Sequence, residues 1–449
     1  SGLFITLPED DLAYQDTFVK ACLAAGINAE VIDPEEAKRM EPSVNPSLIG
    51  AVKVPDGSVD PFRLCASNVF DAKIHGAKVL VYSEVIEFIK EQDTIKGVKV
   101  LDHHTGIVTD YYAPVTVNAG GIWGHHIAQM AGANISMFPA KGALLIFAHR
   151  VNSVVINRCR KPANADILVP GDTVCVIGTT STRVPYEECD HLKVTPDEVD
   201  LLLTEGAKLA PCLAETRVLR AYAGVRPLVS ADNDPSGRNI SRGIVCLDHE
   251  TRDGIKGFIS ITGGKLMTYR LMGEMAADAV CKKLGRDAKC VTADTPLPGS
   301  EPGGIEEISK KIWEVPTMVQ KASVGRFGTQ AANLDFDGDV KGSLVCECEE
   351  VSVSEVDSAI ENLEVNNLVD LRRRTRFGMG TCQGELCACR AAGRLAKARK
   401  CTAKARADLK DFMDERWKGM YPVAWGETLR ESAYTQWVYS EVMGLGEEI

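Results

Sequence analysis

The sequence has no hydrophobic stretch long enough to cross a membrane and no excess of positive charge. None of its apolar runs approaches the ~20 residues that a membrane-spanning helix needs. Over 449 residues the formal net charge is -11, which argues against broad nucleic-acid binding and against a basic membrane-binding face. The length and composition fit a globular protein with about two or three domains.

Residues 1–295 also lack the patterns of several kinds of enzyme. They contain no motif for a nucleophilic serine, no clear Cys–His pair and no set of metal ligands. A GxGxxG-type phosphate-binding turn between a strand and a helix is missing from the whole sequence. The residues of this part of the chain therefore do not indicate nucleophilic or metal-dependent catalysis.

Cysteine, in contrast, is abundant. There are fifteen cysteines, an odd number in a long chain, which favours reduced thiols in the cytosol over a disulfide framework. Most of them occur singly within apolar patterns, and only five lie close together. These five are Cys346, Cys348, Cys382, Cys387 and Cys389.

Four of these cysteines form a metal-ligand pattern. Cys346 and Cys348 make a C-x-C pair, and Cys382 and Cys387 follow after a further thirty-three residues. Four thiolates on loops and helix starts can hold a [2Fe–2S] cluster, and a structural zinc ion is the main alternative. Purely structural cysteines are a third possibility. Cys389 is left out, because two residues past Cys387 on a helix it faces away.

The stretch 258–270, FISITGGKLMTYR, joins a β-branched run to a helical pattern that extends from Leu266 to about Leu284. The glycines between them allow a ligand to approach the backbone, and the helix start with Lys265 suits negative charge, such as that of a reduced flavin. A second glycine turn, Ala119-Gly120-Gly121, follows a strand pattern. Either could also be an ordinary tight turn of an α/β domain.

Six short motifs carry a family resemblance. They resemble, in the same order, motifs of the FAD-dependent glycerol-3-phosphate dehydrogenases, among them the A subunits of the bacterial anaerobic enzymes. The C-terminal cysteine spacing is similar to that of bacterioferritin-associated-ferredoxin-type (BFD-like) [2Fe–2S] domains. The motifs are VNAGGIW (117–123), PAKG (139–142), IGTT (177–180), AGVRPL (223–228), ISRG (240–243) and TGGKLMTYR (262–270).

The resemblance implies an α/β (α+β) fold of the two-dinucleotide-domain flavoprotein type, with an antiparallel substrate-cap sheet and a small helical four-cysteine domain. Because family members begin with an FAD fingerprint that is absent here, the chain is expected to lack its N-terminal FAD-binding segment. The expected parts are an oxidoreductase domain at 1–295 with a cap sheet at about 135–255, a linker and helical connection at 296–340, a BFD-like domain at 341–395, and an aromatic-rich extension at 396–449.

The activity implied by the resemblance is FAD-dependent oxidation of sn-glycerol 3-phosphate to dihydroxyacetone phosphate. Electrons would pass through flavin and iron–sulfur centres to membrane quinone in anaerobic respiration. The implied partners are a second flavin subunit, together with a membrane-anchoring iron–sulfur subunit that would hold the cytoplasmic chain at the inner face of the membrane. Two alternatives remain open: another flavin dehydrogenase, acting on amines or amino acids, and a zinc-binding interaction module.

The resemblance also implies roles for individual residues. His149 is the expected catalytic base, with His125 and His126 as alternatives. Arg226 is expected to act in catalysis and, with Arg242 and Lys265, to bind the substrate, since arginine suits bidentate binding of phosphate. The expected cofactor-binding residues are Ala119, Gly120, Thr262, Gly263, Gly264, Lys265 and Leu266, and the expected cluster ligands are Cys346, Cys348, Cys382 and Cys387.

Two further features lie near the C-terminus. Arg372, Arg373, Arg374 and Arg376 are interpreted as a solvated helix end, with tuning of the cluster or docking of a partner as alternatives. The tryptophans and tyrosines of residues 410–449 suggest packing against the first domain or against a partner chain.

Overall fold

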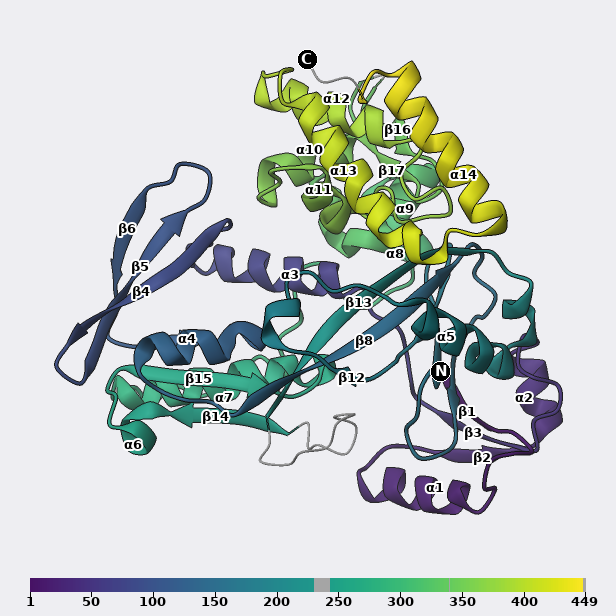
Figure 1. Cartoon of the computed structure of the whole chain (residues 1–449), viewed down its shortest axis with the longest axis horizontal. Helices are drawn as coiled ribbons and strands as arrows, with labels where there is room; N and C mark the ends of the chain where they lie inside the picture. The colour runs from purple at the N-terminus through teal and green to yellow at the C-terminus, as the bar shows by residue number, and fades with distance from the viewer. Residues whose placement is uncertain (230–242, 339, 447–449) are drawn as a thin grey trace.

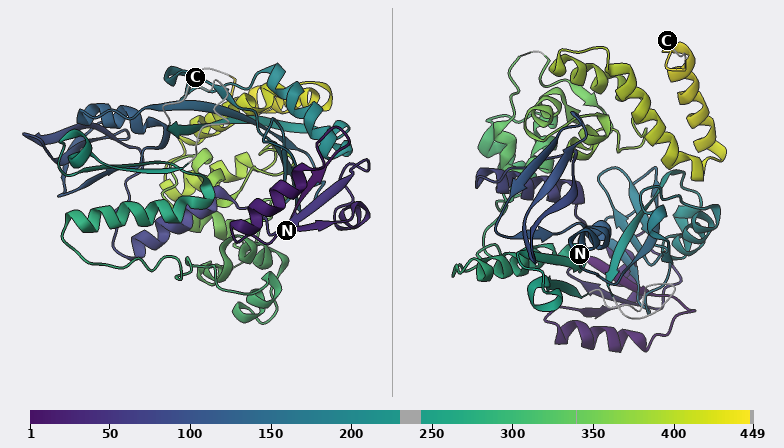
Figure 2. Two further views of the ribbon diagram at one scale, coloured as in Figure 1. Left: turned by 90° about the horizontal axis from the view of Figure 1, so that it is seen from below. Right: turned by 60° about the vertical axis from the view of Figure 1, so that its left-hand side comes forward.

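The chain folds into a large sheet, a small sheet, a projecting three-stranded arm and a C-terminal helical module. The computed structural model describes residues 1–229, 243–338 and 340–446. Figure 1 shows the helical module lying across one end of the large sheet. Figures 1 and 2 show the arm projecting on the side away from the N-terminal strands.

The large sheet has the order β12-β8-β11-β10-β9-β1-β3-β2, with β13 paired along β8. All its pairs are antiparallel except β1 with β9. Its apolar side chains pack against α5, which contributes Val199, Leu202 and Leu209 to the core. The strands are β1 (Gly2–Thr6), β2 (Glu30–Ile32), β3 (Gly50–Val54), β8 (Met137–Phe147), β9 (Val155–Arg158), β10 (Ile167–Pro170), β11 (Cys175–Gly178), β12 (Thr182–Arg183) and β13 (Val218–Val229).

The small sheet has the order β14-β15-β7, and its β7–β15 pair is parallel. The arm is an antiparallel meander in the order β4-β5-β6, and β16 and β17 form a short hairpin in the C-terminal module. These strands are β4 (Ser83–Glu91), β5 (Thr94–Asp102), β6 (Val108–Tyr112), β7 (Thr116–Asn118), β14 (Ile244–Asp248), β15 (Phe258–Gly263), β16 (Leu344–Cys346) and β17 (Val351–Ser352).

Fourteen α-helices complete the described residues, and none of them is long and apolar enough to span a membrane. They are α1 (Tyr14–Ala24), α2 (Pro34–Met40), α3 (Pro61–Ile74), α4 (Gly124–Ala131), α5 (Pro196–Leu209), α6 (His249–Asp253), α7 (Tyr269–Lys283), α8 (Ile305–Ile312), α9 (Met318–Phe327), α10 (Val353–Asn362), α11 (Leu368–Thr375), α12 (Ala388–Arg399), α13 (Ala405–Met420) and α14 (Gly426–Trp437).

Capping residues explain where several helices begin. The Thr195 hydroxyl accepts from the N–H of Glu198 and thereby caps α5, and a capping box of Ser352 and Glu355 opens α10. The Asp60 carboxylate accepts from two N–H groups at the start of α3. These short-range bonds satisfy donors that a helix start would otherwise leave unpaired.

The domain organisation differs in detail from the expected boundaries. The large sheet takes in β1, β2 and β3 as well as the expected cap at about 135–255, because β1 pairs with β9 and buries Leu3 and Ile5. Within that range, β14 belongs to the small sheet. The extension at 396–449 packs on both sides: Phe412 and Met413 of α13 join the core of the C-terminal module, and Val423 joins the core of the large sheet.

Candidate functional site

The two glycine turns lie at the same edge of the small sheet. β7 and β15 are parallel neighbours with Asn118 opposite Ser260. Because both strands end at this edge, the turn at 119–121 and the turn at 263–264 come side by side. The crevice outside the carboxyl ends of parallel strands is the usual ligand position in such sheets.

Both turns require glycine. Gly263 has φ +76°, and a Cβ there would lie 2.3 Å from the carbonyl oxygen of Gly243. A Cβ on Gly120 would lie 2.5 Å from the Cδ1 of Ile127. Their N–H groups help to shape the turns: Gly120 donates to the side chain of Asn118, and Gly264 donates to the carbonyl of Gly243.

A buried chain of hydrogen bonds holds the first turn from below. The Nδ2 of Asn118 donates to the carbonyl of Gly124 (2.8 Å) and to the Oγ of Ser260 (3.2 Å). The Nδ1 of His249 donates to the carboxylate of Asp253 (2.5 Å), and the Nε2 of the same ring is hydrogen-bonded to the Oγ of Ser260 (2.8 Å). His249 is fully buried and stacks on a phenylalanine ring, so this set supports the turn and is not reached by substrate.

The residues at this edge fit an FAD site. The Oγ1 of Thr262 is buried and has no hydrogen-bond partner among the described residues, as expected for a hydroxyl that faces a bound group. Lys265 is exposed directly after the second turn, and Leu266 is 49% exposed. Close backbone approach and a cation are what a flavin with a negatively charged reduced form requires.

Arg226 lies where three sequence motifs meet. It occupies β13 opposite Ala140 of β8, and its Nη2 donates to the Oγ1 of Thr179 (2.5 Å). The guanidinium crosses Gly142, where a Cβ would lie 2.5 Å from the Nη2. The 121–123 turn contacts both β8 and β13, and β13 contacts β15. The structure thus brings Arg226 to the end of β13 that adjoins the glycine turns.

His149 is not brought to this site. It follows β8 at the end opposite Ala140 and is exposed. Ala140 and Phe147 are seven residues apart on one strand, which separates them by ~23 Å. Arg242 lies outside the described residues. His125 lies in α4 just after the first turn, where its Nδ1 bonds the carbonyl of Ile135 and its ring stacks on Tyr186.

One group near Arg226 was not singled out by the sequence. Lys141, next to Gly142, makes a buried ion pair with Glu198 of α5 (2.9 Å). The other oxygen of Glu198 accepts from Thr180 (3.0 Å), whose hydroxyl also receives the N–H of Ala143. In the sequence, Lys141 belongs to the PAKG motif and Thr180 to the IGTT motif. Neither motif shows that both residues bind Glu198, the glutamate of the α5 capping box.

The four predicted cluster ligands come together at the hairpin and the start of α12. The Sγ of Cys348 lies 3.8 Å from those of both Cys346 and Cys382. Hydrogen bonds with Cys348 and Cys387 lower the pKa of Cys346 and of Cys382. The same bonds raise the pKa of Cys348 and Cys387. The four sulfurs therefore form one hydrogen-bonded ring, the cysteine ring.

The loop glycines make room for this ring. A Cβ on Gly380 would lie 2.7 Å from the Sγ of Cys348. The backbone N–H groups of Gly378 and Gly384 donate to Cys346 and Cys382 respectively, as expected for loops that hold thiolates. The remaining cysteine of the group, Cys389, points instead toward Met443, 3.7 Å away.

Four cysteine sulfurs on short loops are the donor set of either a [2Fe–2S] cluster or a structural zinc ion, and the 3.8 Å spacing is compatible with both. A zinc ion would hold the four thiolates around one centre. A [2Fe–2S] cluster instead spreads four thiolates over two irons.

The arginines of residues 372–376 do not form a solvated helix end. The Nε of Arg372 is buried, and Arg376 pairs with Asp60 (2.9 Å), Glu349 (2.9 Å) and Asp172 (3.1 Å). Arg373 is the exposed member of the group. The expectation failed because it considered α11 alone, whereas α3 and α13 cover it.

Comparison with family models defines the class of protein. The model of FAD dependent oxidoreductases matches residues 1–270, and the model of BFD-like [2Fe–2S] binding domains matches residues 344–395. The chain is thus an FAD-dependent oxidoreductase with a [2Fe–2S] domain, and its cofactors are FAD and this cluster.

Individual relatives narrow the class to a family. The chain is 59% identical over 447 residues to the A subunit of the anaerobic glycerol-3-phosphate dehydrogenase of Haemophilus influenzae, which covers 99% of this chain and 79% of that protein. It is 60% identical over 449 residues to the corresponding protein of Escherichia coli K12, with 100% of this chain and 83% of that protein covered. The chain belongs to the family of anaerobic glycerol-3-phosphate dehydrogenase A subunits. Because these relatives are named as subunits, they work together with partner chains.

A more distant relative and a solved structure agree with this assignment. The A1 subunit of the Haloferax volcanii enzyme is 38% identical over 461 residues, covering 100% of this chain and 77% of that protein. The glycerol-3-phosphate dehydrogenase of Bacillus halodurans, solved with FAD, superposes with a TM-score of 0.70 at 22% identity over 89% of this chain and 84% of that chain. The latter likeness shows the shared fold.

Proposed function

We propose that the chain oxidises sn-glycerol 3-phosphate to dihydroxyacetone phosphate and passes the electrons toward membrane quinone. The observation that carries this proposal is the meeting of Arg226 with the edge where both glycine turns end. A phosphate needs a cation with several donors beside the flavin, and arginine supplies five donors in a fixed plane. The cysteine ring on the same chain supports an outlet for single electrons.

The roles of the residues follow from their positions. Bound FAD supplies a hydride acceptor, and the cluster supplies a one-electron carrier. Arg226 binds the phosphate and is oriented by Thr179 and by the cradle at Gly142. Lys265 and, by resemblance, Arg242 add positive charge, and the turn residues Ala119, Gly120, Thr262, Gly263, Gly264 and Leu266 line the flavin. Cys346, Cys348, Cys382 and Cys387 hold the cluster. His149 is not part of this proposal, because the strand separates it from Arg226.

The proposed partners are a second flavin subunit, together with a membrane-anchoring iron–sulfur subunit that holds the chain at the cytoplasmic face of the membrane. Three tryptophans on the C-terminal extension support a partner. Trp417, Trp425 and Trp437 are 39%, 47% and 55% exposed, and tryptophan is a residue type that protein interfaces favour. The extension also packs against the first domain, as the other expectation held, but the three tryptophan rings remain exposed in that packing.

The test is the substrate dependence of an Arg226→Ala variant of the FAD-loaded enzyme. Loss of a charge-assisted bond, about 1.5–3 kcal/mol, predicts a rise in KM for glycerol 3-phosphate of ~10- to 100-fold. Arg226→Lys should recover part of the loss, and activity toward unphosphorylated glycerol should change little. An unchanged KM in Arg226→Ala, or activity only with amines or amino acids, would contradict the proposal.

Two glycines give a matched pair for the same test. Gly142→Ala places a methyl group against the guanidinium of Arg226, whereas a Cβ on Gly224, directly opposite in the ladder, meets no atom within 4 Å. Gly142→Ala should therefore raise KM for glycerol 3-phosphate at least severalfold, and Gly224→Ala should not.

A further inference from the structure

Three arginines from different parts of the chain meet beside the cysteine ring. Arg220 comes from β13 of the large sheet, Arg372 from α11 of the cluster module, and Arg416 from α13 of the C-terminal extension. Arg220 and Arg416 are only 6% and 4% exposed. The fold therefore assembles this set from three separate segments.

Each of the three has a buried N–H group without a partner in the described structure. These are the Nη1 of Arg220, the Nε of Arg372 and the Nε of Arg416. Their other contacts are few. The Nη2 of Arg220 donates to the carbonyl and to the Oε1 of Glu415 (3.2 Å each). Arg372 donates to the Oε1 of Gln383 (3.2 Å), and Arg416 reaches the hydroxyl of Thr435 at 3.5 Å. Buried guanidinium groups this poorly paired are costly unless another negative charge lies close by.

Arg220 packs tightly against helix α13. It lies against the backbone of α13 at Gly419, where a Cβ would come 2.4 Å from the Nε of Arg220. Any other residue at position 419 would push the guanidinium away. Arg220 is thus held in place by the shape of α13 as well as by Glu415.

The nearby carboxylates do not fully account for these charges. Glu415 is one-third exposed, and Glu431, which pairs with Arg217 (2.7 Å), is nearly half exposed. Glu385 is the other carboxylate facing Arg416. Partly exposed carboxylates are screened by water and compensate a buried charge weakly.

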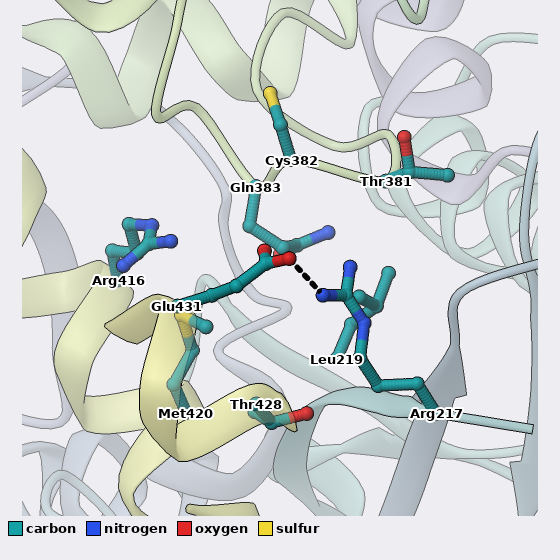
Figure 3. A pocket seen from close by; sticks show the side chains of 9 residues that line it. All are labelled: Arg217, Leu219, Thr381, Cys382, Gln383, Arg416, Met420, Thr428 and Glu431. Carbon is teal, nitrogen blue, oxygen red and sulfur yellow. Dashed lines mark ion pairs between the residues drawn. The ribbon is translucent and has the colours of Figure 1, made fainter. Parts of the chain in front are cut away.

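The set adjoins the segment that carries the second cysteine pair. Figure 3 shows Cys382, with its sulfur turned away from the cavity, and Gln383 on the opposite side of a small cavity from Arg416. Arg416 and Cys382 are close enough for their charges to interact. Gln383, which follows Cys382 directly, is the residue that Arg372 contacts. The charge of Arg372 is also close enough to Cys387 for the two to interact. Both cysteines of the second pair therefore have a buried arginine beside them.

We propose that Arg220, Arg372 and Arg416 raise the reduction potential of the [2Fe–2S] cluster. Held by four thiolates, the cluster carries about two negative charges when oxidised and a third when reduced. Reduction adds one electron and breaks no bond, so buried positive charge stabilises the reduced form more than the oxidised form. The set would make the cluster a better acceptor for electrons from the flavin. The inference depends on the cluster and does not depend on which alcohol is oxidised.

The experiment is an EPR-monitored redox titration of the cluster in the anaerobically purified full chain. Arg372→Gln and Arg416→Gln should each shift the reduced-to-oxidised ratio at a fixed potential by about tenfold, which is a fall of about 59 mV for a one-electron couple. Arg372→Lys and Arg416→Lys, which keep the charge, should stay closer to the wild-type potential. Arg373→Gln is the matched control, because Arg373 directly follows Arg372 and its side chain is exposed to solvent.

A variant of opposite sign covers the case in which a glutamine variant fails to assemble the cluster. Glu415→Gln removes the carboxylate that faces Arg220 at a partly exposed position, and the potential should then rise. Potentials for the glutamine variants that equal that of Arg373→Gln, or a Glu415→Gln potential that is unchanged or lower, would overturn the proposal. An unchanged KM in Arg226→Ala would contradict the proposed function but would not bear on this inference about the cluster potential.

Discussion

At the scale of single residues, a buried hydrogen-bonded chain runs from Asp253 through His249 and Ser260 to Asn118. Ser260→Ala removes one member of this chain and leaves the Nε2 of His249 without its partner. An unsatisfied buried polar group costs about 1–3 kcal/mol. Asn118 also loses its bond to Ser260 and therefore holds the turn at Gly120 less firmly. We expect lower stability and a lower FAD content after purification.

Ser354→Ala is the control for this substitution. Ser354 is equally buried, but its hydroxyl has no hydrogen-bond partner in the described structure, so its removal leaves nothing unpaired. FAD content and thermal unfolding temperature are the two measurements. Equal values for the two alanine variants would show that Ser260 does not support the turn.

Individual residues were predictable where the sequence itself carries the geometry. The glycine turns and the four cysteines fall into short motifs, so a local pattern was enough to find them. His149 was placed at the site by its distance in sequence from PAKG, but an eleven-residue strand carries the chain away from the site over that distance. The burial of Arg372 depends on α3 and α13, which are remote in sequence.

At the scale of elements, the Lys141–Glu198 pair ties β8 to the first turn of α5. Both side chains are about one-tenth exposed. Lys141→Met would leave Glu198 buried without its counter-charge, a loss of about 3–5 kcal/mol. We expect a clear fall in the urea concentration at the unfolding midpoint.

Lys208→Met tests whether the loss of any ion pair would lower the urea midpoint as much. Lys208 pairs with Glu205 one turn away on the same helix and is 41% exposed, where such pairs contribute at most about 1 kcal/mol. A midpoint for Lys141→Met no lower than that of Lys208→Met would refute the role of the buried pair. The double variant Lys141→Met/Glu198→Met should recover part of the stability.

Element starts were predictable from capping residues, as Thr195 and Ser352 show, because caps act over three or four residues. Sheet membership was not predictable in the same way. β1 pairs with β9, about 150 residues later in the chain, and this is why the large sheet extends beyond the expected cap.

At the scale of the whole molecule, Arg376 connects the cluster module to the rest of the chain. It bridges Glu349 of the module to Asp60 and Asp172 of the first part, and it is 15% exposed. Arg376→Ala would leave these carboxylates facing one another and loosen the module. Reduction of the cluster by glycerol 3-phosphate should slow at least tenfold in single-turnover measurements, while the cluster itself is retained.

Arg374→Ala provides the comparison within the same segment. Arg374 donates to the carbonyl of Leu363 inside the module, so its loss leaves the contact between the two parts intact. Equal rates of cluster reduction in the two variants would contradict a docking role for Arg376. The resemblance predicted an oxidoreductase domain and a BFD-like domain joined by a linker, but the Arg376–Asp60 contact between them joins residues more than 300 positions apart.

One strand, β13, carries Arg226 at the end that adjoins the glycine turns and Arg220 at the end that adjoins the cysteine ring. The two lie six residues apart and so point to the same face. Substitutions between them can be tolerated one at a time, whereas inserting or deleting a single residue would turn one arginine to the opposite face. In the evolution of this family the length of the segment from 220 to 226 should be fixed even where its residues vary.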